Sequence, residues 1–253
     1  REANSKSVQL TQRDKNLDSD LQEERSSYKT KPIKRPQVPS KITRSELGPV
    51  VGEGEWKRVY VLKDNEDLVI ALQDHASFLK GEEDLDREEI QSEINDLNQL
   101  EQAGFPVVKN HGIVNVDWQS GIVMDRVPNA LELKHRGDKP KGEGYGKPMF
   151  ERLNENSRND LQLIRDKLNA NPDIAMKDMQ MLVKEDGHLL LHDSLLIQND
   201  PKNKQKVEKY HKDNLLSLDL IEASINQKRP ITPEELMPKV APPIPPRSNH
   251  QKR

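Results

Sequence analysis

The first half of the chain alternates short apolar runs with turn residues. The apolar runs lie at residues 50–51, 56–62, 68–72, 111–116 and 121–127, and turns rich in Gly, Asn or Asp separate them. Runs of this length joined by tight turns are typical of strands that follow one another in an antiparallel meander. The pattern therefore predicts a small antiparallel sheet that begins near residue 47.

Three other segments place apolar residues at every third or fourth position, which predicts amphipathic helices. They lie within 86–104, 159–168 and 208–227, and the first stops at Gly104, a helix C-terminal signal. The repeating apolar residues are Ile90, Ile94, Leu97 and Leu100, then Leu161, Ile164 and Leu168, and then Leu215, Leu218, Ile221 and Ile225.

Residues 174–195, between the last two helices, are predicted to form a hairpin with an acid at each outer end. The turn is Asp186-Gly187, and an apolar strand follows it over His188 to His192. Asp178 stands at the start of the first arm and Asp193 follows the second. Because antiparallel pairing brings the ends of the arms together, we expect both carboxylates to face one pocket.

The composition predicts that part of the chain is not folded. Only 32% of the residues are hydrophobic and 33% are charged, a balance that is lean for a chain folded throughout. We assign residues 1–45 to a disordered basic arm, 229–253 to a Pro-rich basic tail, and the Gly-, Lys- and Pro-rich residues 128–155 to a flexible insertion.

Charge and cysteine content narrow the functional classes. The net charge is −3, but residues 45–227 carry 23 basic and 35 acidic side chains, and an acidic body argues against a nucleic-acid-binding core. The chain has no cysteine, which excludes disulfides and thiolate chemistry. No apolar run approaches the length of a membrane span.

A glycine-containing turn between two predicted strands is the first candidate site. Gly52 and Gly54 precede Lys57; glycines let backbone amides approach phosphate groups, and a lysine facing the same cavity adds positive charge. An ordinary hairpin turn is the alternative. The rival glycine loop at 142–146 lacks a flanking strand and helix, so we interpret it as a flexible loop.

The order of strands, acid-bearing helix, second helix and two-acid hairpin resembles the protein-kinase fold over about residues 47–227. The resemblance implies an α+β, two-lobed protein-kinase-like fold flanked by disordered tails. Its small antiparallel-sheet N-lobe would span 46–127, and its reduced, mostly helical C-lobe 128–228. ATP and Mg²⁺ are the cofactors that such a fold implies.

The resemblance also implies roles for residues of the N-lobe. The third strand contains no lysine, whereas Lys57 on the second strand stands where the with-no-lysine kinases carry theirs. Glu93 would be the helix carboxylate that pairs with it; Glu89, one turn earlier, is an alternative, as is a solvent-facing role for Glu93. The backbone from Met124 to Val127 would be the linker that holds adenine, or only the last strand of the meander.

In the C-lobe, Asp178 would be the catalytic aspartate that accepts the proton of the substrate hydroxyl, and Asp193 would hold Mg²⁺. The asparagine expected five residues after Asp178 is replaced by Val183. Gln180, whose amide oxygen can reach a hard cation, is our substitute for it. His188 and His192 share a face of the strand, but without a third ligand nearby we expect structural roles for them.

A narrower resemblance rests on the Asp178-x-Gln180 pattern and on His192-Asp193-Ser194. Both are similar to the HopBF1-like bacterial type III effector kinases, which imitate clients of the eukaryotic heat-shock chaperone and phosphorylate it. This implies a secreted effector or toxin that acts in the host cytoplasm and phosphorylates a host protein on Ser or Thr.

Two other functions remain open from the sequence. One is a small-molecule kinase, although a lysine-rich insertion suits a protein substrate better than a cationic drug. The other is a pseudokinase scaffold that acts through its tail, where Pro242, Pro245 and Arg247 match the polyproline pattern bound by SH3 domains. A chance match in a Pro-rich tail is the alternative for this motif.

Overall fold

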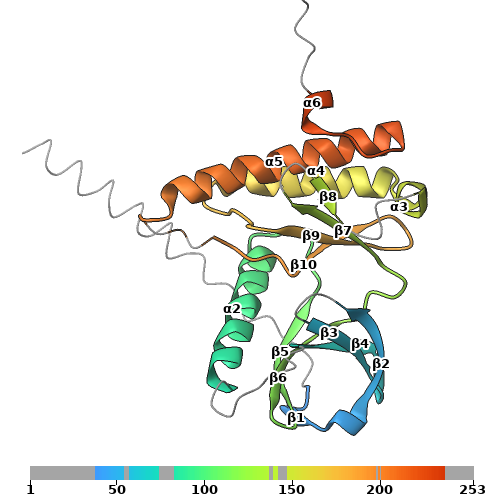
Figure 1. Ribbon diagram of the computed structural model, residues 1–253, viewed down its shortest axis with the longest axis vertical. Helices are drawn as coiled ribbons and strands as arrows, with labels where there is room; N and C mark the ends of the chain where they lie inside the picture. Colours follow the sequence, from blue (N-terminus) through green and yellow to red (C-terminus); the bar gives the residue numbers. More distant parts are fainter. Residues whose placement is uncertain are drawn as a thin grey trace, which may run out of the picture. The chain divides into compact units, whose positions relative to one another are not determined.

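The computed structural model describes residues 38–53, 57–73, 83–136, 139–141, 147–197, 199 and 201–236. The chain divides into a unit of residues Arg1–Pro36 and a unit of Gln37–Arg253. All of the described residues belong to the second unit, which contains two sheets with their helices (Figure 1).

The first sheet has six strands in the order β1-β5-β6-β4-β3-β2. Its strands are β1 (Lys41–Ile42), β2 (Leu47–Glu53), β3 (Lys57–Leu62), β4 (Asn65–Gln73), β5 (Asn110–Val116) and β6 (Gln119–Asp125). All neighbouring pairs are antiparallel except β1 with β5. The strands predicted from the short apolar runs are present, and β2–β3–β4 and β5–β6 pair as antiparallel neighbours. Strand β6 rather than β5 lies next to β4, so the sheet is not one continuous meander.

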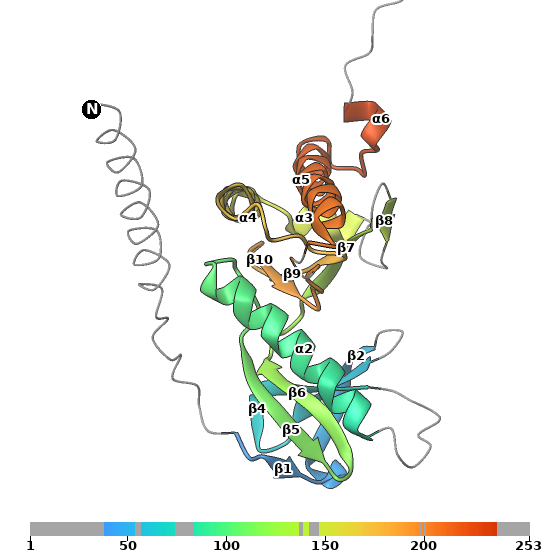
Figure 2. The same cartoon turned by 90° about the vertical axis from the view of Figure 1, so that its left-hand side faces the viewer.

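Helix α2 (Glu83–Gln102) lies alongside β5 and β6 (Figures 1 and 2). Ile90 and Ile94 pack against Ile122 of β6, so the apolar stripe seen in the sequence faces the sheet. The other face of the sheet holds a separate core that includes Ile70 and Val123, both fully buried. This sheet and α2 form the N-lobe.

The second sheet has four strands in the order β10-β9-β7-β8. Its strands are β7 (Leu131–Arg136), β8 (Lys139–Lys141), β9 (Met179–Val183) and β10 (Leu189–His192), and its helices are α3 (Lys147–Arg152), α4 (Glu155–Ala170), α5 (Lys204–Gln227) and α6 (Pro233–Leu236). Helices α4 and α5 cover one face (Figure 1). Alternate residues of β9 (Met179, Met181 and Val183) are buried in one core with Leu161 and Ile164 of α4. Together they form the C-lobe.

The two lobes share main-chain hydrogen bonds. The N–H of Val108, which follows α2, donates to Leu191 O of β10 at 2.9 Å, and Leu191 N–H donates to Pro106 O at 2.8 Å. In the linker after β6, Arg126 N–H donates to Asp67 O at 2.7 Å. The fold is therefore the two-lobed, kinase-like α+β fold that the element order predicted.

The prediction of a flexible insertion at 128–155 was wrong for much of that range. Strand β7 pairs with β9, with Leu131 opposite Val183, and Leu133 and Met149 are at most 1% exposed in the main core. The Gly, Lys and Pro content hid a strand whose partner lies some fifty positions away in the sequence. The glycine loop at 142–146 lies outside the described residues.

The predicted boundary between the disordered arm (residues 1–45) and the N-lobe was also wrong. Residues 41–42, assigned to the disordered arm, form β1, and Ile42 is only 6% exposed because it packs in the N-lobe core. At the other end, Ile231 is 2% exposed and precedes α6, so the fold continues past the predicted boundary at 228. Residues 1–37 and 237–253 lie outside the described residues.

Within the described part of the chain, no helix is both long and apolar enough to cross a membrane.

Candidate active site

The predicted two-acid hairpin is formed by β9 and β10. His192 lies opposite Gln180 in the register of the two strands, so Asp178, just before β9, and Asp193, just after β10, stand at the same end. The turn closes with Lys184 N–H donating to His188 O at 2.8 Å. Pairing of the arms therefore places both aspartates at one end of the hairpin. That their carboxylates face one pocket stays a prediction.

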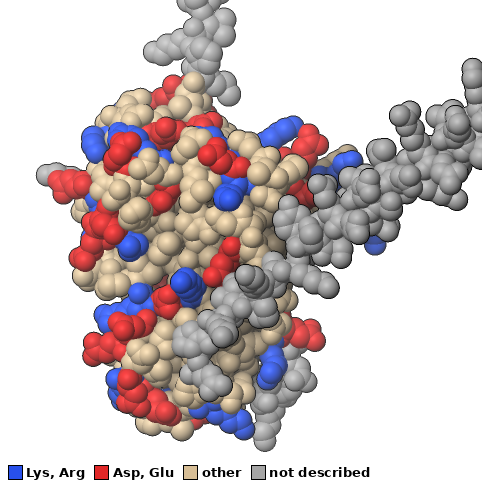
Figure 3. Space-filling model, turned by 180° about the vertical axis from the view of Figure 1, so that it is seen from behind, with Lys and Arg blue, Asp and Glu red and all other residues tan. Residues whose placement is uncertain are grey.

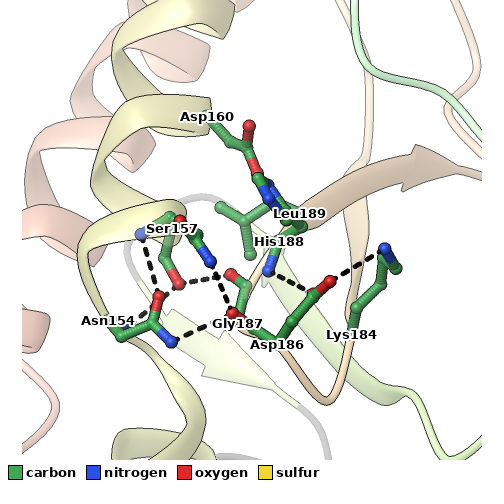
Figure 4. Close-up of polar contacts among 9 residues, drawn as sticks. Asn154, Ser157, Asp160, Lys184, Asp186, Gly187, His188 and Leu189 are labelled. Carbon is green, nitrogen blue, oxygen red and sulfur yellow. Dashed lines mark hydrogen bonds and ion pairs between the residues drawn. The ribbon is translucent and has the colours of Figure 1, made fainter.

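The N-terminus of α4 holds the turn at the other end of the hairpin (Figure 4). Asn154 Nδ2 donates to Asp186 O at 3.0 Å, and Ser157 Oγ donates to Gly187 O at 2.5 Å. Gly187 has φ +86°, and a Cβ there would collide with the Asn154 side chain. Only glycine fits this turn, because both the backbone conformation and the space demand it.

Asp160 on α4 accounts for one of the two histidines considered as metal ligands. Its Oδ2 accepts from Leu189 N–H and contacts Nδ1 of His188, both at 2.8 Å (Figure 4). His192 lies beside Glu132 of β7, with Nε2 3.5 Å from Oε1. Among the described residues, no cluster of three or more His, Cys, Asp or Glu side chains could hold a metal ion. His188 thus contacts Asp160 of α4, and His192 contacts Glu132 of β7.

Lys57 on β3 is the point where the N-lobe meets the hairpin. Its ammonium group is hydrogen-bonded to Glu93 Oε2 of α2 and, at 2.9 Å, to Asp193 Oδ1. The side chains of Lys57 and Glu93 are 20% and 8% exposed, whereas that of Asp193 is 40% exposed. Lys57, Glu93 and Asp193 thus form one ion-paired group. The two acids lie 36 and 136 positions from the lysine in the sequence.

Burial and charge act in opposite directions on this group. Burial would lower the pKa of Lys57, but the carboxylates of Glu93 and Asp193 outweigh it, and the pKa is raised above its usual value. Burial raises the pKa of Glu93, and Asp193 adds to this rise while Lys57 opposes it. Lys57 is therefore held protonated between the two acids.

The structure also separates the two candidate partners on α2. Lys57 lies directly opposite Gln73 of β4, and Gln73 Nε2 donates to Glu89 Oε2 at 3.1 Å. Glu89 therefore pairs with a neutral amide, while Glu93 pairs with the lysine.

We expect Glu93→Gln to lower kcat/KM by about 10- to 100-fold, because it removes a charged hydrogen bond worth about 1.5–3 kcal/mol. Glu89→Gln, one turn earlier on the same helix, should change it less than about threefold, because it alters only an amide contact. Steady-state kinetics with ATP as the varied substrate would measure both. Equal losses in the two variants would mean that the pairing with Lys57 is not what matters.

Gln180 and Val183 face opposite sides of β9. Val183 is fully buried in the core, and its hydrocarbon side chain has no atom that could coordinate a metal. Gln180 Nε2 donates to Asp178 Oδ2 at 3.3 Å, and its Oε1 is buried with no hydrogen-bond partner. An acceptor oxygen of this kind beside a carboxylate suits a hard cation, so the residues present fit Mg²⁺.

Two side chains of α5 that were not predicted as site residues hold the segment before Asp178. Asn214 of α5 accepts from Met176 N–H at 2.8 Å and donates to Met176 O at 2.9 Å. His211 Nδ1 contacts Ile174 O at 2.9 Å. A signal for Asn214 did exist: it stands four residues before Leu218 on the apolar face of its helix, where a polar side chain needs a partner.

The remaining predicted positions belong to the N-lobe. Gly52 lies on β2 opposite Val59, and a Cβ there would meet Val59 at an ordinary 3.5 Å; Gly54 lies outside the described residues. Met124 packs beside α2 at the end of β6, and Val127 follows in the linker. Phosphate binding by Gly52 and Gly54, and adenine binding by Met124 and Val127, stay predictions.

A two-lobed fold with a lysine–glutamate pair in one lobe and two hairpin aspartates in the other defines the class: this is a protein-kinase-like domain. Residues 17–217 match the family described as the type III secretion system effector HopBF1 kinase domain. The chain belongs to that family. It is therefore a type III effector kinase, a class that uses ATP and acts on a protein substrate.

Proposed function

We propose that the protein transfers the γ-phosphoryl group of ATP to a Ser or Thr hydroxyl of a host protein, in the cytoplasm of the host cell. The observation that carries this proposal is the contact of Lys57 with both Glu93 and Asp193. It brings the phosphate-positioning lysine to the hairpin end where Asp178 stands. Such an arrangement favours transfer, because phosphoryl transfer depends mainly on positioning and charge.

Each residue then has a distinct task. Asp178 orients the acceptor hydroxyl and accepts its proton, and Lys57 holds phosphate oxygens through its protonated amine. Asp193 and Gln180 are the residues that would hold Mg²⁺, which supplies positive charge to the phosphate oxygens when bound. Gln180 also steadies Asp178 through its amide N–H.

The eukaryotic heat-shock chaperone is the substrate we propose, because the Asp178-x-Gln180 and His192-Asp193-Ser194 patterns resemble the effector kinases that phosphorylate it. The surface supports a protein target over a nucleic acid. On the face seen in Figure 3, basic and acidic side chains are interspersed rather than gathered into one basic patch. The scaffold alternative depends on Pro242, Pro245 and Arg247, which lie outside the described residues.

Incubation with Mg²⁺ and γ-labelled ATP tests the proposal directly, first with the purified chaperone and then with eukaryotic lysate. The Asp178→Ala variant runs in parallel. Label on the chaperone at a serine or threonine, absent with the variant, is the expected result. Label on another lysate protein alone would overturn the chaperone as target, and label on tyrosine would overturn the Ser/Thr preference. No transfer to any protein would overturn the kinase activity.

Replacing Gln180 by alanine tests the proposed metal site. We expect the Mg²⁺ concentration for half-maximal activity to rise about tenfold or more, since a ligand oxygen is lost, while saturating Mg²⁺ restores part of the rate. Gln91→Ala, an exposed glutamine on α2, is the matched control. An unchanged Mg²⁺ titration in Gln180→Ala would remove this residue from the metal site.

A further inference from the structure

We propose that Asp96 is a positioning residue that ties helix α2 to the segments carrying both aspartates; this rests on the kinase activity proposed above. Asp96 stands one turn after Glu93 on the same helix. Its Oδ2 accepts the N–H of Leu196 at 3.0 Å, across 100 residues of sequence, and it is only 4% exposed. Two acids of α2 thus connect the helix to the end of the hairpin. Glu93 does so through Lys57, and Asp96 through the main-chain N–H of Leu196.

Leu196 in turn lies against the segment that leads to Asp178. It forms an antiparallel bridge with Met176. Main-chain hydrogen bonds flank the bridge, from Lys177 N–H to Leu195 O at 2.8 Å and from Ile197 N–H to Ala175 O at 2.9 Å. A displacement of Leu196 would therefore also shift the backbone before Asp178 and the backbone after Asp193.

The far side of Met176 is held as well. Asn214 of α5 bonds to both the N–H and the carbonyl of Met176. Asp96, Leu196, Met176 and Asn214 thus form a continuous series of contacts from the N-lobe helix to the C-lobe helix. Because it joins the segment before Asp178 to the segment after Asp193, it holds the two in one relative placement.

The backbone of Asp193 points to the same role. Its φ is +45°, a left-handed conformation that costs energy for a residue other than glycine. Such a conformation persists only where the surroundings impose it. The side chain of Asp193 is held by Lys57. The backbone three residues further on is held by the hydrogen bond from Leu196 N–H to Asp96.

A carboxylate at this buried position is costly, which argues that it serves a purpose. Burial raises the pKa of Asp96, while the hydrogen bond from Leu196 N–H lowers it. An apolar residue would fill the same helix face without that cost. What it could not do is accept the N–H of Leu196.

The test compares Asp96→Leu and Asp96→Ala, which remove the acceptor, with Asp96→Asn, which keeps an oxygen in place. Glu88→Ala, an exposed acid on the same helix, is the control. We expect kcat to fall about 10- to 100-fold in Asp96→Leu and Asp96→Ala, with a smaller change in KM for ATP. Asp96→Asn should recover most of the rate, and Glu88→Ala should match the wild type.

Hydrogen exchange of the peptide covering residues 193–197, measured without nucleotide, supplies the second readout. The Leu196 amide should exchange at least tenfold faster in Asp96→Leu and keep near wild-type protection in Asp96→Asn. Because the leucine side chain fills the buried space, Asp96→Leu provides the comparison if Asp96→Ala does not fold. Wild-type kcat in Asp96→Leu, unchanged exchange of that peptide, or an Asn variant as slow as the Leu variant would each overturn the role of Asp96. An inactive wild-type protein would overturn the kinase proposal instead, and the exchange result would still decide whether Asp96 holds this segment.

Discussion

Asp178→Ala is expected to lower phosphoryl transfer by about 10²–10⁴-fold, the usual contribution of a positioned acid–base group, and to leave nucleotide binding nearly intact. The carboxylate stands just before β9 and is steadied by Gln180, whereas the ion-paired group that we propose meets the phosphates is built on Lys57. Single-turnover transfer of labelled phosphate gives the rate, and a titration with ATP and Mg²⁺ gives the affinity.

Asp173→Ala is the matched control for this variant, because Asp173 is an exposed acid five residues earlier on the same segment. It should transfer phosphate at the wild-type rate. If Asp178→Ala kept more than about a tenth of the rate, Asp178 would not be the catalytic aspartate. If both variants lost activity together, the segment rather than the carboxylate would be responsible.

Lys57→Met is expected to abolish activity and also to destabilise the fold. The lysine is the partner of both Glu93 and Asp193, so its removal leaves the largely buried Glu93 carboxylate unpaired. Breaking a buried ion pair from one side typically costs about 3–5 kcal/mol. Thermal unfolding measures the loss of stability, and the transfer assay the loss of function.

The destabilisation of Lys57→Met should depend on pH in a defined direction. Lys57 opposes the rise in the pKa of Glu93 that burial causes, so the variant should raise that pKa further above the unfolded value of about 4.3. A carboxyl group with a raised folded pKa stabilises the fold when protonated and loses that contribution as pH rises through the folded value. The Tm deficit should therefore be larger at pH 8 than at pH 5.

Lys63→Met, at an exposed lysine just after β3, is the control and should show neither effect. Full activity in Lys57→Met would mean that another lysine positions the phosphates. A Tm deficit that grew as the pH fell would show that Glu93 is not the group left unpaired.

The parts of the site that follow from local patterns could be predicted from the sequence. The β9–β10 hairpin rests on the alternation of Met179, Met181 and Val183 and on the turn at Gly187, where only glycine fits. Once those arms pair, Asp178 and Asp193 must stand at one end. The pairing of Lys57 with a helix acid was likewise expected, because the resemblance to the kinase fold implied it.

Other features depended on contacts that no local pattern encodes. Glu89 and Glu93 lie one turn apart on one helix, and only the packing of α2 on the sheet decided that Glu93 meets Lys57. Strand β7 was hidden in a polar segment, because its strand character comes from pairing with β9 rather than from its own residues. Asp96 and Asn214 stand among mostly apolar buried positions of their helices, and each bonds to a backbone group brought there by the fold. Periodicity and turn chemistry in the sequence thus determined the elements and the hairpin acids. The tertiary structure alone decided which buried polar groups meet, because a hydrogen bond depends on positions in space that residues distant in the chain reach only after folding.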